Sequence, residues 1–174
     1  MAKSFQDRAA LVVCGLVALA AWPLRSQEVK PTKQDEAVTA AKLLAEADGQ
    51  FGSRDLVRAG ASYRRVLDLP AANPVHAKAY YGLARIAALS DDDDQAEELF
   101  RKTLKTSPDD VTKSWVYLYL GRIAFGAGER DEAQKNFRAV LAITAAPELV
   151  KTAAQKELAR ANRPARPTQP PAKN

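Results

Sequence analysis

The sequence predicts an all-α protein built from repeated helix pairs, and three observations support this fold class. The 174 residues are 47% hydrophobic and 27% charged with only 8 glycines and 10 prolines, and the abundant residues (Ala, Leu, Arg, Lys and Glu) favour helices. Short segments recur at a fixed spacing of 37 residues, which is the signature of a repeat architecture. Helix-start signals such as Asn73-Pro74 and Ser107-Pro108 separate the recurring segments.

The N-terminal segment, residues 1–26, has the pattern of a secretory signal peptide. Two basic residues precede an unbroken apolar run over residues 9–22, which is shorter than the roughly 20 residues needed to span a bilayer. Cleavage is expected after Ala18-Leu19-Ala20 or near Ser26-Gln27. We therefore expect an exported protein, periplasmic or secreted; the alternative is that residues 9–22 remain as an inner-membrane anchor.

The only cysteine, Cys14, lies inside this apolar run. A bulky valine, Val13, precedes it, which argues against a lipid-bearing cysteine. If the signal is removed, the mature chain has no cysteine and therefore neither disulfides nor thiol chemistry.

Charge is unevenly distributed along the chain. Residues 27–159 carry 19 Lys and Arg against 20 Asp and Glu, whereas residues 160–174 carry 4 basic residues and no acid. A nucleic-acid-binding module needs a basic face on a folded body, so we expect no nucleic acid partner. The proline-rich basic tail, residues 162–174, is predicted to be disordered.

Three segments align at the 37-residue period and predict the second helix of each pair. Each starts with an alanine, followed four residues later by an aromatic residue. The repeating positions are Ala59 and Tyr63, Ala96 and Phe100, and Ala133 and Phe137.

The first helices of the pairs repeat as well. Leu83-Ala84-Arg85-Ile86-Ala87 returns 37 residues later as Leu120-Gly121-Arg122-Ile123-Ala124. The small residues Ala84 and Gly121 allow two helices to approach closely, while the aromatic residue of the partner helix fills the space alongside.

The turn signals give the expected elements in order. Helices are predicted at residues 34–51, 55–69, 74–89, 94–106, 109–126, 130–144 and 147–161. The last has one apolar side and a charged back, as expected of a helix that closes a stack of repeats. The predicted organisation is a linker or helix start at residues 27–37, a repeat domain at residues 38–161, and the tail.

The run Asp91–Asp94 raises the question of a cation site, an acidic contact or a helix start. The repeat aligns it with Gly128–Asp131, the turn between two helices of a pair. Asp94 and Asp131 are predicted to cap the helices that follow. The run lacks the glycine and the spaced ligands of a calcium loop, so a cation site is the weaker alternative.

These repeats resemble tetratricopeptide (TPR) repeats over residues 38–145. The second unit matches the family pattern at Tyr80, Leu83, Ala84, Ala87, Ala96, Phe100, Thr103 and Pro108. The third matches at Leu120, Gly121, Ala124, Ala133, Phe137 and Val140, with Ala145 in place of the final proline. The first unit keeps Ala59, Tyr63 and Val66, but its first helix departs from the pattern.

The resemblance implies a right-handed superhelix of about three helix pairs plus a capping helix. It also implies a concave groove, lined by the first helix of each pair, that binds a peptide or a protein partner. The longer period is similar to periplasmic TPR domains of bacterial cell-envelope proteins. Carried over position by position, the groove residues are Leu44, Asp48, Phe51, Lys78, Tyr81, Arg85, Leu89, Trp115, Leu118, Arg122 and Phe125.

Arg85 and Arg122 stand 37 residues apart and are expected to share one face of the groove. Two arginines beside aromatic residues suit a partner with acidic and apolar side chains. The alternative is that both arginines are solvated and their stems cover neighbouring aliphatic groups. Chaperone-binding TPR domains use a lysine and asparagine clamp; arginine stands at the asparagine positions here, so that activity is not carried over.

Nothing in the sequence predicts an enzyme, a metal site or a cofactor. His76 is the only histidine, and no His or Cys pair has metal-ligand spacing. Gly126-Ala127-Gly128 lacks the lysine and the strand of a phosphate-binding loop. Two functions remain: an exported scaffold that binds protein through its groove, or an anchored envelope component whose basic tail contacts anionic lipid or cell-wall polymer.

Overall fold

The computed structural model describes residues 32–163, which form seven α-helices and no strand. The all-α prediction is confirmed, and no predicted helix end differs from the structure by more than two residues. The helices are α1 (Lys33–Gly52), α2 (Leu56–Leu67), α3 (Asn73–Leu89), α4 (Asp93–Lys105), α5 (Asp110–Gly126), α6 (Arg130–Ala142) and α7 (Glu148–Ala161).

Several predictions concern residues outside this range: the signal peptide or anchor, the first five residues of the linker, and nearly all of the basic tail. Within residues 32–163, no helix has the length and apolar character needed to cross a bilayer.

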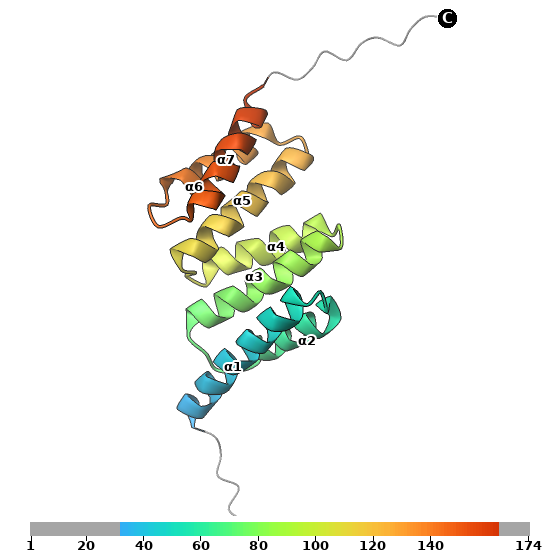
Figure 1. Ribbon diagram of the computed structural model, residues 1–174, viewed down its shortest axis with the longest axis vertical. Helices are drawn as coiled ribbons and strands as arrows, with labels where there is room; N and C mark the ends of the chain where they lie inside the picture. The colour runs from blue at the N-terminus through green and yellow to red at the C-terminus, as the bar shows by residue number, and fades with distance from the viewer. Residues whose placement is uncertain (1–31, 164–174) are drawn as a thin grey trace, which may run out of the picture. The chain divides into compact units, whose positions relative to one another are not determined.

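The described helices form three pairs in a stack (Figure 1). Helix α1 packs on α2, α3 on α4, and α5 on α6, and each pair packs on the next. The first helices also contact one another from pair to pair, α1 with α3 and α3 with α5, while α7 packs on both α5 and α6. This arrangement brings α1, α3 and α5 to one side of the stack.

The repeat positions identified in the sequence form the core. Ala59, Ala96 and Ala133 are fully buried. So are the aromatic residues four positions later, Tyr63, Phe100 and Phe137. Leu83, Leu120 and Ala84 are buried on the first helices, so small and large residues alternate across the helix contacts in each pair.

Two glycines permit the closest helix contacts. A Cβ atom on Gly121 would lie 2.5 Å from Cε1 of Phe137, and one on Gly82 would overlap the ring of Tyr63. The backbones of α3 and α5 therefore lie directly on aromatic rings from α2 and α6.

The structure corrects the predicted start of α4. Asp92, not Asp94, caps it: the Asp92 carboxylate accepts a hydrogen bond from the backbone N–H of Gln95 at 3.1 Å. Asp91 adopts a left-handed φ of 55°, which ends the turn early enough for Asp92 to precede the first helical residue. Asp94 lies in the first turn, where a carboxylate is still favoured by the helix dipole.

Two other predicted helix starts also need correction. Glu129 rather than Asp131 occupies the position before α6, and its side chain makes no capping hydrogen bond. Asp109 caps α5 by accepting from the backbone N–H of Thr112 at 2.7 Å, so Pro108 precedes the cap instead of opening the helix. Pro74 does lie at the start of α3, as Asn73-Pro74 predicted.

Candidate binding groove

Two adjoining hollows lie along the first helices of the pairs, and we call them together the α1–α3–α5 groove. One, of about 410 Å³, is lined by Asp48, Phe51, Gly52, Lys78, Tyr81, Arg85 and Thr112. The other, of about 360 Å³, is lined by Phe51, Gly52, Arg54, Arg85, Ala88, Leu89 and Tyr119. Phe51, Gly52 and Arg85 line both hollows, so the two hollows adjoin at these residues.

Arg85 is held in place by aromatic rings. Its guanidinium carbon lies 3.9 Å from the ring centre of Phe51 and 4.8 Å from that of Tyr81. Such cation–π contacts are worth about 0.5–2 kcal/mol, more when the cation is desolvated. Phe51 lies in the last turn of α1 and Tyr81 lies one turn before Arg85 on α3, so the packing of α1 on α3 creates this arrangement.

A chain of hydrogen bonds ties Arg85 to α1 and α2. Arg85 Nη2 donates to the hydroxyl of Tyr63 at 3.4 Å, and that hydroxyl donates to Oδ1 of Asp48 at 2.6 Å. Arg85 Nε is buried without a hydrogen-bond partner among residues 32–163. The guanidinium is therefore positioned mainly by its rings and by Tyr63.

Tyr63 and Tyr81 are neutral, so the basic side chains set the local charge. Burial, together with the hydrogen bond to Asp48, raises the pKa of Tyr63 above its ordinary value. Burial likewise raises the pKa of Tyr81, although the positive charge of Arg85 opposes the shift. The groove thus presents Arg54, Lys78 and Arg85 against a single carboxylate, Asp48.

The ion pair of Lys78 with Asp109 borders the groove, with Nζ 3.5 Å from Oδ2. Burial by itself would raise the pKa of Asp109, but hydrogen bonds from Thr112 and the charge of Lys78 outweigh it and lower the pKa. Asp109 is therefore ionised and partly neutralises Lys78, which leaves Arg54 and Arg85 as the cations most available to a ligand.

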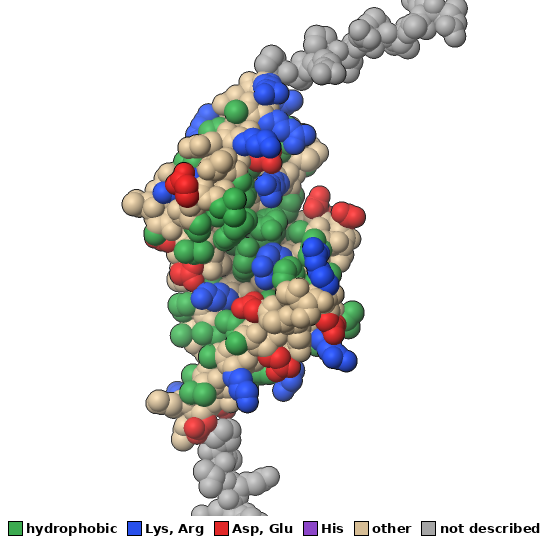
Figure 2. All heavy atoms as spheres, in the orientation of Figure 1, with side chains coloured by type: hydrophobic (Ala, Val, Ile, Leu, Met, Phe, Trp, Pro, Cys, Tyr) green, Lys and Arg blue, Asp and Glu red, His purple; other side chains and the backbone are tan. Residues whose placement is uncertain are grey.

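Aromatic side chains continue the groove from α3 to α5. Tyr119 stacks on Phe100 with ring centres 5.2 Å apart, and Tyr81 and Trp115 lie 6.4 and 6.2 Å from Tyr119. Hydrophobic side chains gather near the middle of the face shown in Figure 2, with basic side chains beside them. The groove is suited to non-covalent contact with apolar and acidic groups.

The potential metal-ligating side chains are dispersed in the described part of the chain. Within residues 32–163, no group of three or more His, Cys, Asp or Glu side chains is placed to hold a metal ion. His76 Nε2 lies 2.9 Å from the carbonyl oxygen of Leu69, so the only histidine connects the start of α3 to the loop before it.

The tetratricopeptide-repeat family matches residues 75–146, the two pairs α3–α4 and α5–α6. Over these residues the chain carries tetratricopeptide repeats. Among solved structures it is similar to the C-terminal TPR-containing domain of a Plasmodium falciparum protein assigned as an FK506-binding protein, at 15% identity and a TM-score of 0.56. That similarity covers 75% of this chain and 93% of the other, and it supports the fold. No curated protein sequence matches the chain.

The TPR positions predicted from the sequence divide between the groove and other surroundings. Six line the α1–α3–α5 groove: Asp48, Phe51, Lys78, Tyr81, Arg85 and Leu89. Leu44 and Leu118 instead belong to the core, at 8% and 0% exposure. Trp115 is half-buried against Tyr119.

Arg122 and Phe125 were expected to line the groove, but the structure places them elsewhere. The capping helix α7 packs on α5, the helix that carries both residues. Arg122 Nε lies 3.5 Å from Oε1 of Glu157 on α7. Phe125 lies beneath the guanidinium groups of Arg130 and Arg160, at 5.7 and 4.8 Å from its ring centre. The two repeat-related arginines thus differ: Arg85 lines a hollow, and Arg122 joins α5 to α7.

Sequence reasoning missed Tyr119 and Arg54 as groove residues. The position equivalent to Tyr119 in the preceding TPR unit is Gly82, so the repeat gave no sign of an aromatic residue there. Arg54 lies in the α1–α2 turn with a left-handed φ of 64°, outside the helices from which the groove positions were taken.

Proposed function

We propose that this TPR protein is a non-enzymatic scaffold that binds a segment of a partner protein in the α1–α3–α5 groove. The observation that carries the proposal is that Arg85 packs on the rings of Phe51 and Tyr81 and lines both hollows. A rigid cation bordered by apolar surface is typical of the residues that dominate protein interfaces.

The chemistry of the groove favours a partner segment with apolar and acidic side chains. The smaller hollow combines Ala88, Leu89 and Tyr119 with Arg54 and Arg85. It suits an apolar side chain with a neighbouring carboxylate, because arginine donates to a carboxylate through two parallel N–H groups. Tyr119 and Phe51 supply large contact area at little cost in side-chain entropy.

Affinity capture with the full chain as bait, followed by mass spectrometry, tests this function. We expect a protein captured by the wild type to be lost with R85A and with L89E. The second variant is needed because R85A also removes the packing of Arg85 on two rings. Leu89 is 50% exposed, so its replacement leaves the core intact. L149D, at an exposed position of α7 outside the groove, serves as the matched control.

Cross-linking of the captured complex locates the contact. Cross-links from the partner to α1, α3 and α5 are expected. Undiminished capture by the R85A/L89E double variant, with native helix content, would exclude the groove as the binding site.

We also propose that the protein is exported, on the basis of the basic and apolar pattern of its first 26 residues. N-terminal sequencing of the protein isolated from cells distinguishes a cleaved signal from a retained anchor. A mature chain that starts after Ala20 or Ser26 is expected; a chain that retains residues 9–22 supports the anchored alternative.

A further inference from the structure

A second pair of hollows lies between successive second helices of the pairs. Helix α2 does not pack directly on α4, nor α4 on α6, in the described part of the chain, so each gap is floored by the intervening first helix. The α2–α4 groove has a volume of about 520 Å³ and the α4–α6 groove about 530 Å³. Helix α3 forms the floor of the first of these grooves and α5 forms the floor of the second. The face of each helix that forms the floor is not the face that lines the α1–α3–α5 groove.

The two grooves are the same site, one repeat apart. Leu83 and Ile86 line the first, and their equivalents 37 residues later, Leu120 and Ile123, line the second. The walls are equivalent too: Leu56, Val57, Gly60, Arg64 and Leu99 in the first groove correspond to Asp93, Asp94, Glu97, Arg101 and Asn136 in the second.

The fold is the same at both grooves, but the chemistry of the walls is not. Four wall positions that are acidic or polar in the α4–α6 groove carry apolar residues or glycine in the α2–α4 groove. Val57 is 85% exposed, although the next repeat forms the same helix start with Asp94 there. The fold therefore does not require an apolar residue at this position. An exposed valine beside other apolar residues is instead typical of a surface that contacts a partner.

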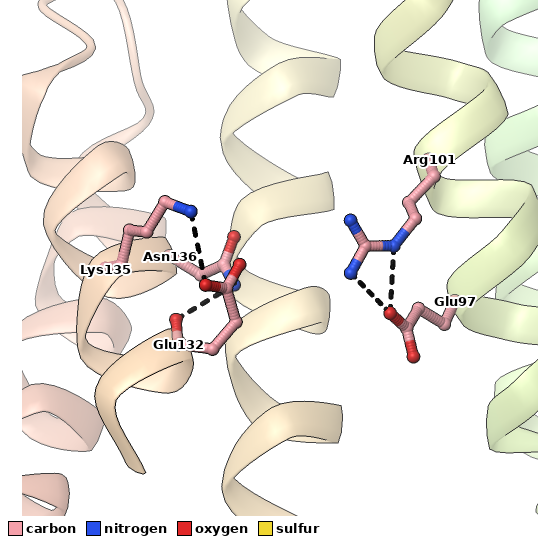
Figure 3. A network of polar contacts seen from close by, with 5 residues as sticks. All are labelled: Glu97, Arg101, Glu132, Lys135 and Asn136. Atoms are coloured by element: carbon pink, nitrogen blue, oxygen red, sulfur yellow. Dashed lines mark hydrogen bonds and ion pairs between the residues drawn. The ribbon is translucent and has the colours of Figure 1, made fainter. Parts of the chain in front are cut away.

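Arg64 differs from its equivalent in the same way. In the α4–α6 groove, Arg101 donates from Nε and Nη2 to Oε1 of Glu97, four residues earlier (Figure 3). In the α2–α4 groove, Gly60 takes the place of that glutamate, and no carboxylate of residues 32–163 pairs with Arg64. A Cβ atom on Gly60 would lie 3.7 Å from Nη1 of Arg64, so the guanidinium lies over the glycine at the groove.

Charge on α2 as a whole is complementary to an acidic partner. Its twelve residues include Arg58, Arg64 and Arg65 and no acid. Figure 3 shows the opposite situation one repeat later, where Glu97 on α4 and Glu132 on α6 face each other across the groove and pair with basic residues of their own helices.

We propose that the α2–α4 groove is a second docking surface, which binds an acidic amphipathic helix of a partner protein. The apolar face of that helix packs on Leu56, Val57 and Leu99, and one of its carboxylates occupies the place that Glu97 has in the next repeat, on Arg64. A helix suits the site because the gap separates two helices that a third could bridge.

The test uses the full chain and a synthetic helical peptide with leucines at positions i, i+3, i+4 and i+7 flanked by glutamates. Fluorescence anisotropy is expected to show saturable binding, weakened roughly tenfold or more by V57D/G60E because apolar contact is lost and carboxylates face carboxylates. The introduced Asp and Glu are the residues found at the equivalent positions of the next repeat, Asp94 and Glu97, so the helix tolerates them. V57D alone is a second variant, at an exposed position. L149D, at an exposed position of α7 outside both grooves, is the control and should bind the peptide unchanged.

A double-mutant cycle tests the Arg64 contact. R64Q is expected to weaken binding of the glutamate peptide but not of a peptide in which one glutamate is replaced by glutamine, and a lysine-flanked peptide should bind more weakly than both. Binding that V57D/G60E leaves unchanged, or equal affinity for the glutamate and lysine peptides, would overturn the proposal. A concentration-dependent dimer of the free wild-type chain that V57D abolishes would overturn it too, because the occupant would then be a second copy.

Discussion

Gly82 and Gly49 are both inside helices of this protein, yet replacing them with alanine should change the free energy of unfolding in opposite directions. A Cβ atom on Gly82 would overlap the fully buried ring of Tyr63, whereas one on Gly49 meets nothing within 4 Å. Because the hydroxyl of Tyr63 is fixed by Asp48, the ring cannot withdraw easily. We expect G82A to lower the free energy of unfolding by about 1–3 kcal/mol.

G49A is the matched control, because alanine in an open helix position is favoured over glycine by about 0.5–1 kcal/mol. Urea unfolding followed by circular dichroism measures both variants. If G82A is as stable as the wild type, then α3 can move away from Tyr63 and the close contact does not limit the packing.

The groove residues show what single-residue reasoning can and cannot predict. The structure brings Asp48, Phe51 and Arg85 together in one hollow, and their expected positions followed from helical spacing and the repeat. Arg122 was not predicted to meet Glu157, because Glu157 lies beyond the last repeat unit and no equivalent residue in the earlier units indicates it.

At the scale of the element, the start of α4 distinguishes between neighbouring aspartates. Asp92 caps the helix and Asp94 does not. We expect D92A to lower the free energy of unfolding by about 1 kcal/mol, since the N–H group of Gln95 loses its partner. D94A should cost only a few tenths, through the helix dipole.

The same unfolding measurement on both variants checks this difference, and equal circular dichroism spectra of the folded proteins serve as the control. An equal or larger cost for D94A would mean that α4 starts two residues later than it does here. The repeat pattern placed an N-terminal cap in this run but assigned it to Asp94 instead of Asp92, because the choice depends on the left-handed backbone of Asp91.

At the scale of the whole molecule, the 37-residue repeat produces the stack of helix pairs, and the capping helix α7 covers its last pair. The described helices contact only members of their own or an adjacent pair, or α7 at the end, so stability is expected to depend on nearest-neighbour contacts. Helix α7 buries Val150, Ala154 and Ala161 in the cluster that contains Leu118 and Phe137. Arg130 on α6 fastens its end by donating to the carbonyl oxygens of Ala161 and Arg163 at 3.2 and 2.6 Å.

Two adjacent residues of α7 therefore test the cap. Val150 is fully buried and Leu149 is 71% exposed, so V150D places a carboxylate in the core while L149D places one in solvent. We expect V150D to lower the free energy of unfolding by roughly 3 kcal/mol or more, and L149D to change it by less than about 0.5 kcal/mol.

Hydrogen exchange in V150D should show where the cap acts. Because neighbouring pairs stabilise one another, loss of α7 should speed exchange first in α5 and α6, while α1 to α3 retain more protection. Uniform acceleration through all the helices would mean instead that the stack unfolds as one cooperative unit, and unchanged exchange in α5 and α6 would show that the last pair is stable without its cap.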